Sequence, residues 1–192
     1  YDHKSGANAA ARFWWMLKSI GHKKVQVLNG GIQEAERMKF PISAKVSHLR
    51  KNLAYKVDGW KLPIAKIDEV EKSILGKSHL IIDIRDSQRY NGDFEPLDLV
   101  AGHIPGAINI PFAGNLDKAG LFLSAEKLKE KYESVFENYD SQNIIIHCGS
   151  GVTACHSLLA IAYAGLEIPK LYVGSWSEWS RNGKSVETKT QL

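Results

Sequence analysis

Short apolar runs alternate with longer segments of helical spacing along the second two thirds of the chain. The apolar runs predict β-strands at residues 80–83, 107–110, 143–147 and 170–173. Apolar residues spaced along one helical face predict helices over residues 64–75, 125–136 and 152–164. Ser124 can cap the second of these helices. Strands that alternate with helices predict an α/β fold with a parallel sheet flanked by helices.

The beginning of the chain repeats the pattern of a later segment. Residues 9–31 read as an apolar helix, a short strand at Val25–Leu28 and a turn, and residues 153–175 repeat that order. From Ala10 to Gly31 the two segments align without a gap at one offset of 144 residues. A period this long indicates a duplicated domain rather than a solenoid. Chance similarity between two helix–strand units is the alternative.

The duplication also predicts the domain boundaries. Counterparts of the strands and helices before the second copy would fall before residue 1, so we expect only the last third of the first copy. Residues 1–36 are then the remnant of one domain, residues 37–62 an ordered connector, and residues 63–192 the second domain. Alternation over Leu53–Val57 predicts an extended piece within the connector.

The composition is that of a globular protein and does not identify its chemistry. The 192 residues are 44% hydrophobic and carry a formal net charge of +4, as in ordinary globular proteins. No block of like charge indicates a nucleic-acid partner, and no apolar run approaches the roughly 18 residues of a membrane span. The two cysteines fit a reducing compartment, so we expect a cytoplasmic protein.

The stretch from His147 to Ala154 is the most informative. Cys148 directly follows the most apolar strand, and Gly149 and Gly151 permit a tight turn before the next helix. Such a loop can direct several backbone N–H groups and a helix N-terminus at one point, which stabilises a thiolate and lowers its pKa. A buried structural cysteine is the alternative. No paired-cysteine metal spacing or Walker phosphate loop occurs, and we expect no metal or cofactor.

Cys155 lies seven residues after Cys148, in the first turns of the predicted helix. We interpret it as a small core residue, because an intact helix makes a disulfide to Cys148 difficult. A resolving thiol is the alternative.

The loop Cys148–Cys155 resembles the active loop of 3-mercaptopyruvate sulfurtransferases within the rhodanese family. Segments 83–85, 102–107 and 174–179 also resemble this family, as does Phe13–Trp15 with Asn29–Gly31 at the end of an inert first domain. The resemblance implies a rhodanese-like sheet and a catalytic domain at residues 63–192. Asp2 stands where the first domain has the counterpart of Cys148, in a loop two residues longer.

The resemblance implies a two-step reaction. The Cys148 thiolate takes sulfur from 3-mercaptopyruvate or thiosulfate, and the persulfide passes it to a thiol or to cyanide, with thioredoxin a candidate acceptor. The implied substrate-binding residues are Arg89, Gly149, Ser150, Gly151, Val152 and Thr153. Ser150 is equally a turn-capping residue, Thr153 a helix cap, and Arg89 a solvated loop residue in the alternative interpretations.

One departure from the family pattern bears on the donor. The mercaptopyruvate enzymes usually have a second arginine shortly after the first, whereas residues 95–100 of this chain contain none. Thiosulfate as the main donor therefore stays an alternative.

Other polar and aromatic residues have structural interpretations. We expect Asp83 and Arg85 to pair beneath the loop, and His103 to be a turn residue. Strand alternation directs His147 away from Cys148. Trp176 and Trp179 are expected to pack in the core or at its rim.

Two other classes of protein compete with a sulfurtransferase. Protein tyrosine phosphatases need an arginine six residues after the cysteine, and that position is Ala154. A non-catalytic rhodanese scaffold is the second rival, because rhodanese folds can be inert, although the intact Cys148 loop argues against it. The family's active site lies between two domains, so a chain without most of the first domain is expected to be inactive in this alternative.

Overall fold

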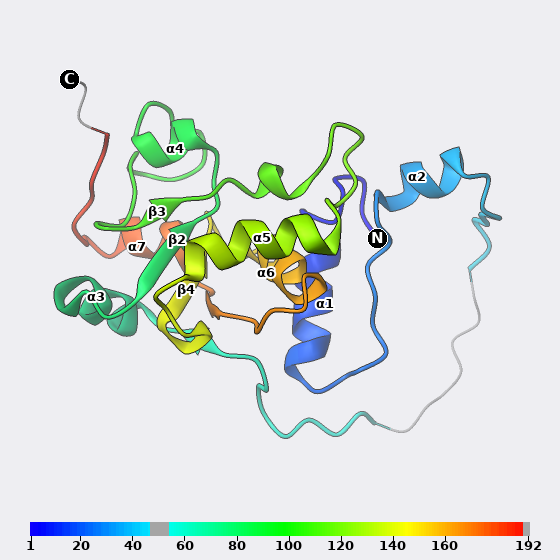
Figure 1. The fold of residues 1–192 in the computed structure, drawn as a ribbon, viewed down its shortest axis with the longest axis horizontal. Helices are drawn as coiled ribbons and strands as arrows, with labels where there is room; N and C mark the ends of the chain where they lie inside the picture. Colours follow the sequence, from blue (N-terminus) through cyan, green and yellow to red (C-terminus); the bar gives the residue numbers. More distant parts are fainter. Residues whose placement is uncertain (47–53, 190–192) are drawn as a thin grey trace.

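The computed structural model describes residues 1–46 and 54–189 and has a five-stranded parallel sheet at its centre (Figure 1). The strand order is β1-β5-β4-β2-β3. The strands span Ile64–Ala65 (β1), Leu80–Asp83 (β2), Ile108–Asn109 (β3), Ile144–His147 (β4) and Lys170–Tyr172 (β5). The predicted parallel α/β fold is confirmed.

Strand β4 lies in the middle of the sheet, and three of its four residues are isoleucines. All four of its residues are buried, and it pairs with β2 through Ile146 opposite Ile82 and His147 opposite Asp83. Alternate side chains enter different cores: Ile144 and Ile146 join one hydrophobic cluster, and Ile145 joins another. Both faces of the sheet are therefore covered, as parallel sheets require.

Helices cover the two faces in separate groups. The helices are α1 (Ala10–Ser19), α2 (Gly31–Arg37), α3 (Ile67–Gly76), α4 (Ser87–Asn91), α5 (Ala125–Phe136), α6 (Ala154–Tyr163) and α7 (Ser175–Arg181), with short 3-10 turns at Phe112–Asn115 (η1) and Ser141–Asn143 (η2). Trp15 of α1, Leu128 of α5 and Leu158 of α6 share one cluster, whereas Val70 of α3 and Trp176 of α7 share the other.

Several predicted boundaries in this domain are corrected. Strand β1 occupies Ile64–Ala65, where a helix was predicted, and α3 begins at Ile67. A helix over residues 64–75 was wrong at its start because the first two residues pair with Leu171 and Tyr172 of β5. The strand predicted at 107–110 contains two residues, and helix α6 starts at Ala154 rather than residue 152. Ser124 caps α5 as expected, with its side chain accepting from the Lys127 N–H.

The first segment forms its predicted helix but not its predicted strand. Helix α1 packs along α6, whereas Val25–Leu28 is irregular. The strand prediction was wrong because a β-strand needs a hydrogen-bonded neighbour, and none lies beside Val25–Leu28 in the described ranges. Of the predicted extended piece, Leu53 lies outside the described residues and 54–57 form no strand.

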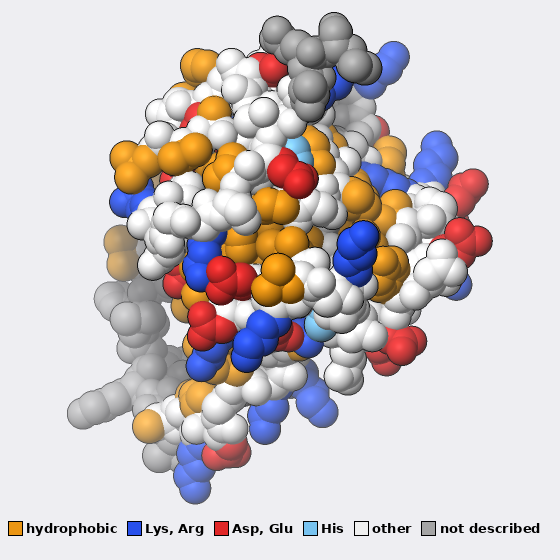
Figure 2. All heavy atoms as spheres, turned by 90° about the vertical axis from the view of Figure 1, so that its left-hand side faces the viewer, with side chains coloured by type: hydrophobic (Ala, Val, Ile, Leu, Met, Phe, Trp, Pro, Cys, Tyr) orange, Lys and Arg blue, Asp and Glu red, His pale blue; other side chains and the backbone are white. Residues whose placement is uncertain are grey.

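The surface shows no dominant charge on the face turned to the viewer in Figure 2, where acidic, basic and hydrophobic side chains are interspersed. Among the described residues, no helix is both long and apolar enough to cross a lipid bilayer.

Candidate active site

Cys148 begins the loop that joins the carboxyl end of β4 to helix α6. Ligand sites of open parallel sheets lie at this edge. The loop turns at Gly151, whose φ of +71° suits glycine, and a Cβ there would overlap the carbonyl oxygen of Val173. Cys148 is 3% exposed, Gly149 is half-buried and Ser150 is exposed. The sulfur therefore lies at the base of the loop, beneath its tip.

The start of helix α7 fixes the backbone of this loop. The Cys148 N–H donates to Ser175 Oγ at 3.2 Å, while the N–H groups of Trp176 and Ser177 donate to the carbonyl oxygens of Cys148 and Gly149 at 3.0 and 2.8 Å. Ser175 is itself held by donating to the Tyr172 carbonyl at 2.8 Å. Sequence reasoning did not identify Ser175 as a loop anchor. The repeat offered a signal for Ser175, because it aligns with a glycine, Gly31. In the structure both residues have a positive φ, +68° for Gly31 and +55° for Ser175.

The loop leaves a row of backbone donors unused. No acceptor among the described residues takes the N–H groups of the five residues from Gly149 to Thr153. Thr153 occupies the N-cap position of α6, yet its side chain makes no cap hydrogen bond, so the capping interpretation is wrong. Val152 and Thr153 are half-buried and lie between the loop tip and the helix.

The loop at the start of the chain directs five of its N–H groups at one carboxylate. The Asp2 carboxylate accepts from the N–H groups of Lys4, Gly6, Asn8, Ala9 and Ala10 at 2.8–3.1 Å. Burial alone would raise the pKa of Asp2, but these backbone bonds outweigh it and hold the pKa far below its ordinary value. Backbone N–H groups in this loop therefore stabilise the Asp2 anion.

Arg89 reaches the other side of the Cys148 loop. Its Nη2 atom lies 3.4 Å from the position that a Cβ of Gly149 would take. The guanidinium is paired rather than solvated: Nη2 lies 2.7 Å from Glu95 Oε1 and 3.3 Å from Asp98 Oδ2. Burial opposes ionisation of Glu95, but its bonds to Arg89 and to the N–H groups of Leu97 and Asp98 lower its pKa overall.

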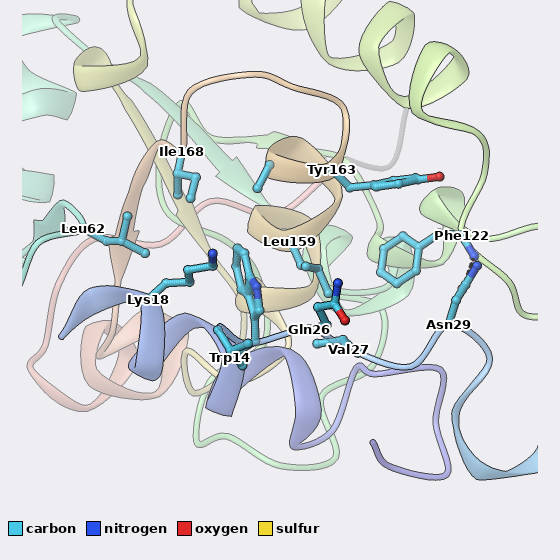
Figure 3. A pocket seen from close by; sticks show the side chains of 12 residues that line it. Trp14, Lys18, Gln26, Val27, Asn29, Leu62, Phe122, Leu159, Tyr163 and Ile168 are labelled. Carbon is cyan, nitrogen blue, oxygen red and sulfur yellow. Dashed lines mark hydrogen bonds between the residues drawn. The ribbon is translucent and has the colours of Figure 1, made fainter. Parts of the chain in front are cut away.

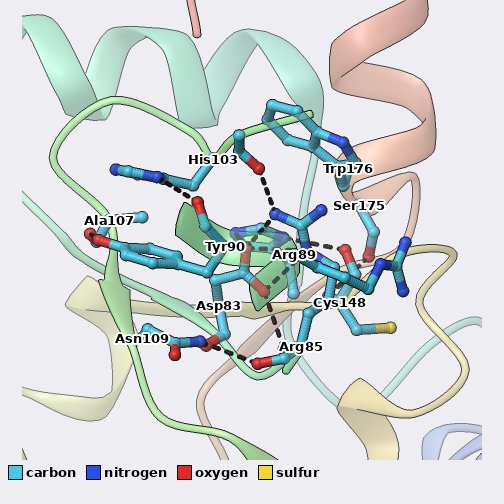
Figure 4. Close-up of polar contacts among 12 residues, drawn as sticks. Asp83, Arg85, Arg89, Tyr90, His103, Ala107, Asn109, Cys148, Ser175 and Trp176 are labelled. Atoms are coloured by element: carbon cyan, nitrogen blue, oxygen red, sulfur yellow. Dashed lines mark hydrogen bonds and ion pairs between the residues drawn. The ribbon is translucent and has the colours of Figure 1, made fainter. Parts of the chain in front are cut away.

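A buried charge network beneath the loop links Arg89 through Glu95 to Arg85, and Figure 4 shows Arg85 with Asp83. Arg85 Nη2 lies 2.6 Å from Asp83 Oδ2, and Arg85 Nη1 lies 3.1 Å from Glu95 Oε2. Arg85 also donates to the Gly102 carbonyl at 2.7 Å and stacks over the Trp176 ring. The predicted structural pairing of Asp83 with Arg85 is confirmed. The Arg85 guanidinium donates to Asp83, Glu95 and the Gly102 carbonyl, so the charges of Asp83 and Arg85 are compensated within the core.

His147 and His103 lie near the loop and contact backbone carbonyl oxygens. His147 is fully buried, its Nδ1 lies 3.1 Å from the Cys148 carbonyl oxygen, and burial lowers its pKa. His103 stacks on Tyr90 and its Nδ1 lies 2.7 Å from the Tyr90 carbonyl oxygen. The interpretation of His103 as a turn residue was wrong, because His103 forms an isolated antiparallel β-bridge with Glu187 through two backbone hydrogen bonds and the turn lies at Pro105 and Gly106.

Cys155 is a core residue. It is fully buried, and burial raises the pKa of its thiol to about 12 despite the nearby Arg12. Its Sγ lies 3.4 Å from the Gly151 carbonyl oxygen, and Arg12 Nη1 lies 3.8 Å from the sulfur. A thiol held protonated in this way is a poor nucleophile. Trp176 and Trp179 are likewise buried, as predicted.

A cavity of about 700 Å³ lies away from Cys148, where α1 meets α6 (Figure 3). Trp14 and Lys18 of α1 and Leu159 and Tyr163 of α6 line it, with Phe122 nearby. None of the residues of the Cys148 loop borders this cavity. The cavity is therefore separate from the loop chemistry.

Comparisons with known proteins agree with the fold. Residues 66–182 match the rhodanese-like domain. The chain is 39% identical over 184 residues to a probable 3-mercaptopyruvate sulfurtransferase of Pseudomonas aeruginosa, covering 93% of this chain and 63% of that protein. It is 32% identical over 187 residues to thiosulfate sulfurtransferase of Gallus gallus, covering 97% of this chain and 64% of that protein.

A solved structure gives the same result. The 3-mercaptopyruvate sulfurtransferase of Leishmania major superposes with a TM-score of 0.79 at 31% identity, covering 95% of this chain and 51% of that one. The chain therefore spans less than two thirds of the length of these relatives. Sequence, sheet order and superposition together show that the chain belongs to the rhodanese family.

Proposed function

We propose that this chain transfers a sulfur atom through a persulfide on Cys148. The observation that carries the proposal is the row of N–H groups from Gly149 to Thr153, in the loop that follows Cys148, for which no described residue supplies an acceptor. Asn8 and Ala9, which lie 144 residues before Val152 and Thr153, direct the same backbone donors at the Asp2 carboxylate. The same donors would stabilise a thiolate and then the anionic persulfide at Cys148.

The chemistry balances without a cofactor. The Cys148 thiolate attacks the sulfur of 3-mercaptopyruvate, an S–S bond forms, and the carbon–sulfur bond breaks. The thiol proton ends on the methyl group of pyruvate, and the persulfide anion stays on Cys148. An acceptor thiolate then attacks the outer sulfur and regenerates the Cys148 thiolate, so each half-reaction is a separate displacement.

The proposed donor site lies between Arg89 and the loop. Arg89 has no partner among the described residues for its Nη1 atom, which is 3.6 Å from the Cβ position of Gly149. A donor carboxylate or sulfonate would bind this nitrogen and the loop N–H groups. The exposed Ser150 hydroxyl would contact the donor or acceptor at the loop tip, with Val152 and Thr153 contributing their N–H groups.

The acceptor and the setting are also part of the proposal. A small thiol, cyanide or thioredoxin would receive the sulfur at the exposed loop tip. Two free cysteines fit a reducing compartment such as the cytoplasm, where a persulfide acceptor is a thiol.

We also propose that residues 1–36 descend from an inactive copy of the domain, that residues 37–62 connect the copies and that residues 63–192 carry the activity. The carboxylate of Asp2 in place of a thiol supports this division. Helix α1 packing along α6, its counterpart in the repeat, supports it further.

The test is a sulfur-transfer assay with cyanide as acceptor, measuring thiocyanate. Wild-type chain is compared with Cys148→Ser and Cys155→Ser, using 3-mercaptopyruvate and thiosulfate in separate reactions. We expect transfer by wild type and by Cys155→Ser and none by Cys148→Ser. Faster transfer from thiosulfate would favour the alternative donor. A chain that transfers sulfur from neither donor would contradict the proposal, and hydrolysis of p-nitrophenyl phosphate instead would indicate a phosphatase.

A further inference from the structure

The charge of Arg89 is already shared by two carboxylates. Glu95 accepts from Arg89 Nε at 3.1 Å and from Nη2 at 2.7 Å, and Asp98 approaches the same Nη2 at 3.3 Å. Both acidic side chains are only 3% exposed. An anion that binds Arg89 therefore meets two fixed negative charges where water cannot screen them well.

Asp98 also lies directly against the loop that holds Cys148. Its Oδ2 atom is 3.9 Å from the Cβ position of Gly149, the residue after the sulfur. Ser177 donates to its other oxygen at 2.6 Å, and the Ser177 N–H donates to the Gly149 carbonyl at 2.8 Å. The carboxylate is therefore anchored at the reaction site by the same helix that anchors the loop.

The network as a whole is negative. The guanidinium groups of Arg85 and Arg89 face the carboxylates of Asp83, Glu95 and Asp98, which leaves one net negative charge. The rim beside this network is apolar, because Leu97 is 73% and Leu99 is 75% exposed. A negative interior with an apolar rim disfavours a donor with two negative charges more than a donor with one.

We propose that Asp98 determines donor specificity by competing with anionic donors for Arg89, so that a donor with one negative charge is preferred over a donor with two. This inference rests on the proposed function, because it concerns the donor side of the same site. Asp98 is a specificity-determining residue here and takes no part in bond making.

A pair of alkylating probes that differ only in charge tests the inference without sulfur transfer. Iodoacetamide and iodoacetate both alkylate a thiolate, with the carbon–sulfur bond forming as iodide leaves. The second-order rate constants at Cys148 are measured by peptide mass spectrometry on the full chain. We expect D98N to raise the iodoacetate-to-iodoacetamide ratio about fivefold, because one like charge near the sulfur is removed.

The control is D93N, which removes the same charge from an exposed residue of the same loop that does not contact Arg89. We expect its ratio to change less than about twofold. An equal ratio in wild type, D98N and D93N would overturn the inference. If D98N fails to fold, D98A and D98S are measured in its place, and a ratio equal to that of wild type in a folded variant would overturn it as well.

Donor kinetics separate this inference from the proposed function. With 3-mercaptopyruvate as donor, we expect D98N to lower KM about fivefold relative to wild type. An unchanged KM in a chain that forms the persulfide would overturn the role of Asp98 alone. Absence of any persulfide in wild type would overturn the proposed function, while the probe ratio would still decide the role of Asp98.

Discussion

Replacing Gly151 by alanine perturbs the loop at its most constrained position. Gly151 has a φ of +71°, and a Cβ would overlap the carbonyl oxygen of Val173 while lying 3.1 Å from its carbonyl carbon. Val173 directly follows strand β5 and precedes the turn into helix α7, so it is not free to move. The loop must therefore shift instead, and with it the N–H groups beside Cys148.

The magnitude has two parts. A left-handed conformation costs a residue with a Cβ about 1–2 kcal/mol. Overlap with a fixed backbone atom in a packed region adds about 1–3 kcal/mol. Gly165→Ala isolates the first part, because Gly165 has a φ of +78° and its Cβ would meet nothing within 4 Å. We expect Gly151→Ala to be destabilised by about 3 kcal/mol in total.

Urea denaturation of wild type, Gly151→Ala and Gly165→Ala measures the free energies of unfolding. The rate of persulfide formation is measured on the same samples, and we expect a loss of about 100-fold or more for Gly151→Ala alone. If both variants were destabilised equally, the overlap with Val173 would play no part. If Gly151→Ala kept the wild-type rate, the loop geometry would not matter for the chemistry.

Three further predictions follow from buried groups. Asp2→Asn should destabilise the chain by about 2 kcal/mol at neutral pH. The pKa of Asp2 is lower in the folded chain than in the unfolded chain, so the ionised carboxylate stabilises the fold above the ordinary carboxyl pKa of about 4. This stabilisation is lost as the pH falls through the folded pKa. The urea midpoints of Asp2→Asn and wild type should therefore converge only in strong acid. Cys155→Ala should keep the wild-type transfer rate and cost about 1 kcal/mol of stability, and loss of transfer would contradict its core role. Arg85→Lys should cost about 3 kcal/mol by urea denaturation, since one ammonium cannot bridge Asp83, Glu95 and the Gly102 carbonyl, and an unchanged midpoint would refute this.

Much of the fold could be predicted because its signals are local. The apolar run that forms β4, the cap at Ser124 and the glycine turn after Cys148 each depend on a few adjacent residues. Strand β1 was missed because two residues carry no periodicity, and its identity depends on pairing with β5. The strand predicted at Val25–Leu28 failed for the converse reason, since its pattern has no neighbouring strand to pair with in the described residues.

The sequence allowed the Cys148 loop to be predicted, but not the residues from other parts of the chain that surround it. Cys148 and its glycines lie in one short stretch, so the loop could be inferred from adjacent residues. The partners of Arg89 could not, because Glu95 and Asp98 reach it only through the course of the loop after α4. Ser175 anchors Cys148 from 27 residues away, which the order of the strands alone brings about.

We propose that Cys148 accepts sulfur at the start of a loop with backbone donors unused by the described residues. The most direct measurement is peptide mass spectrometry of the full chain after incubation with 3-mercaptopyruvate or thiosulfate and removal of excess donor. We predict a gain of one sulfur atom, about 32 Da, on the peptide containing Cys148, localised to that residue and released by cyanide. A chain that is folded, exposed to both donors and unmodified at Cys148, or modified only at Cys155, would contradict the account.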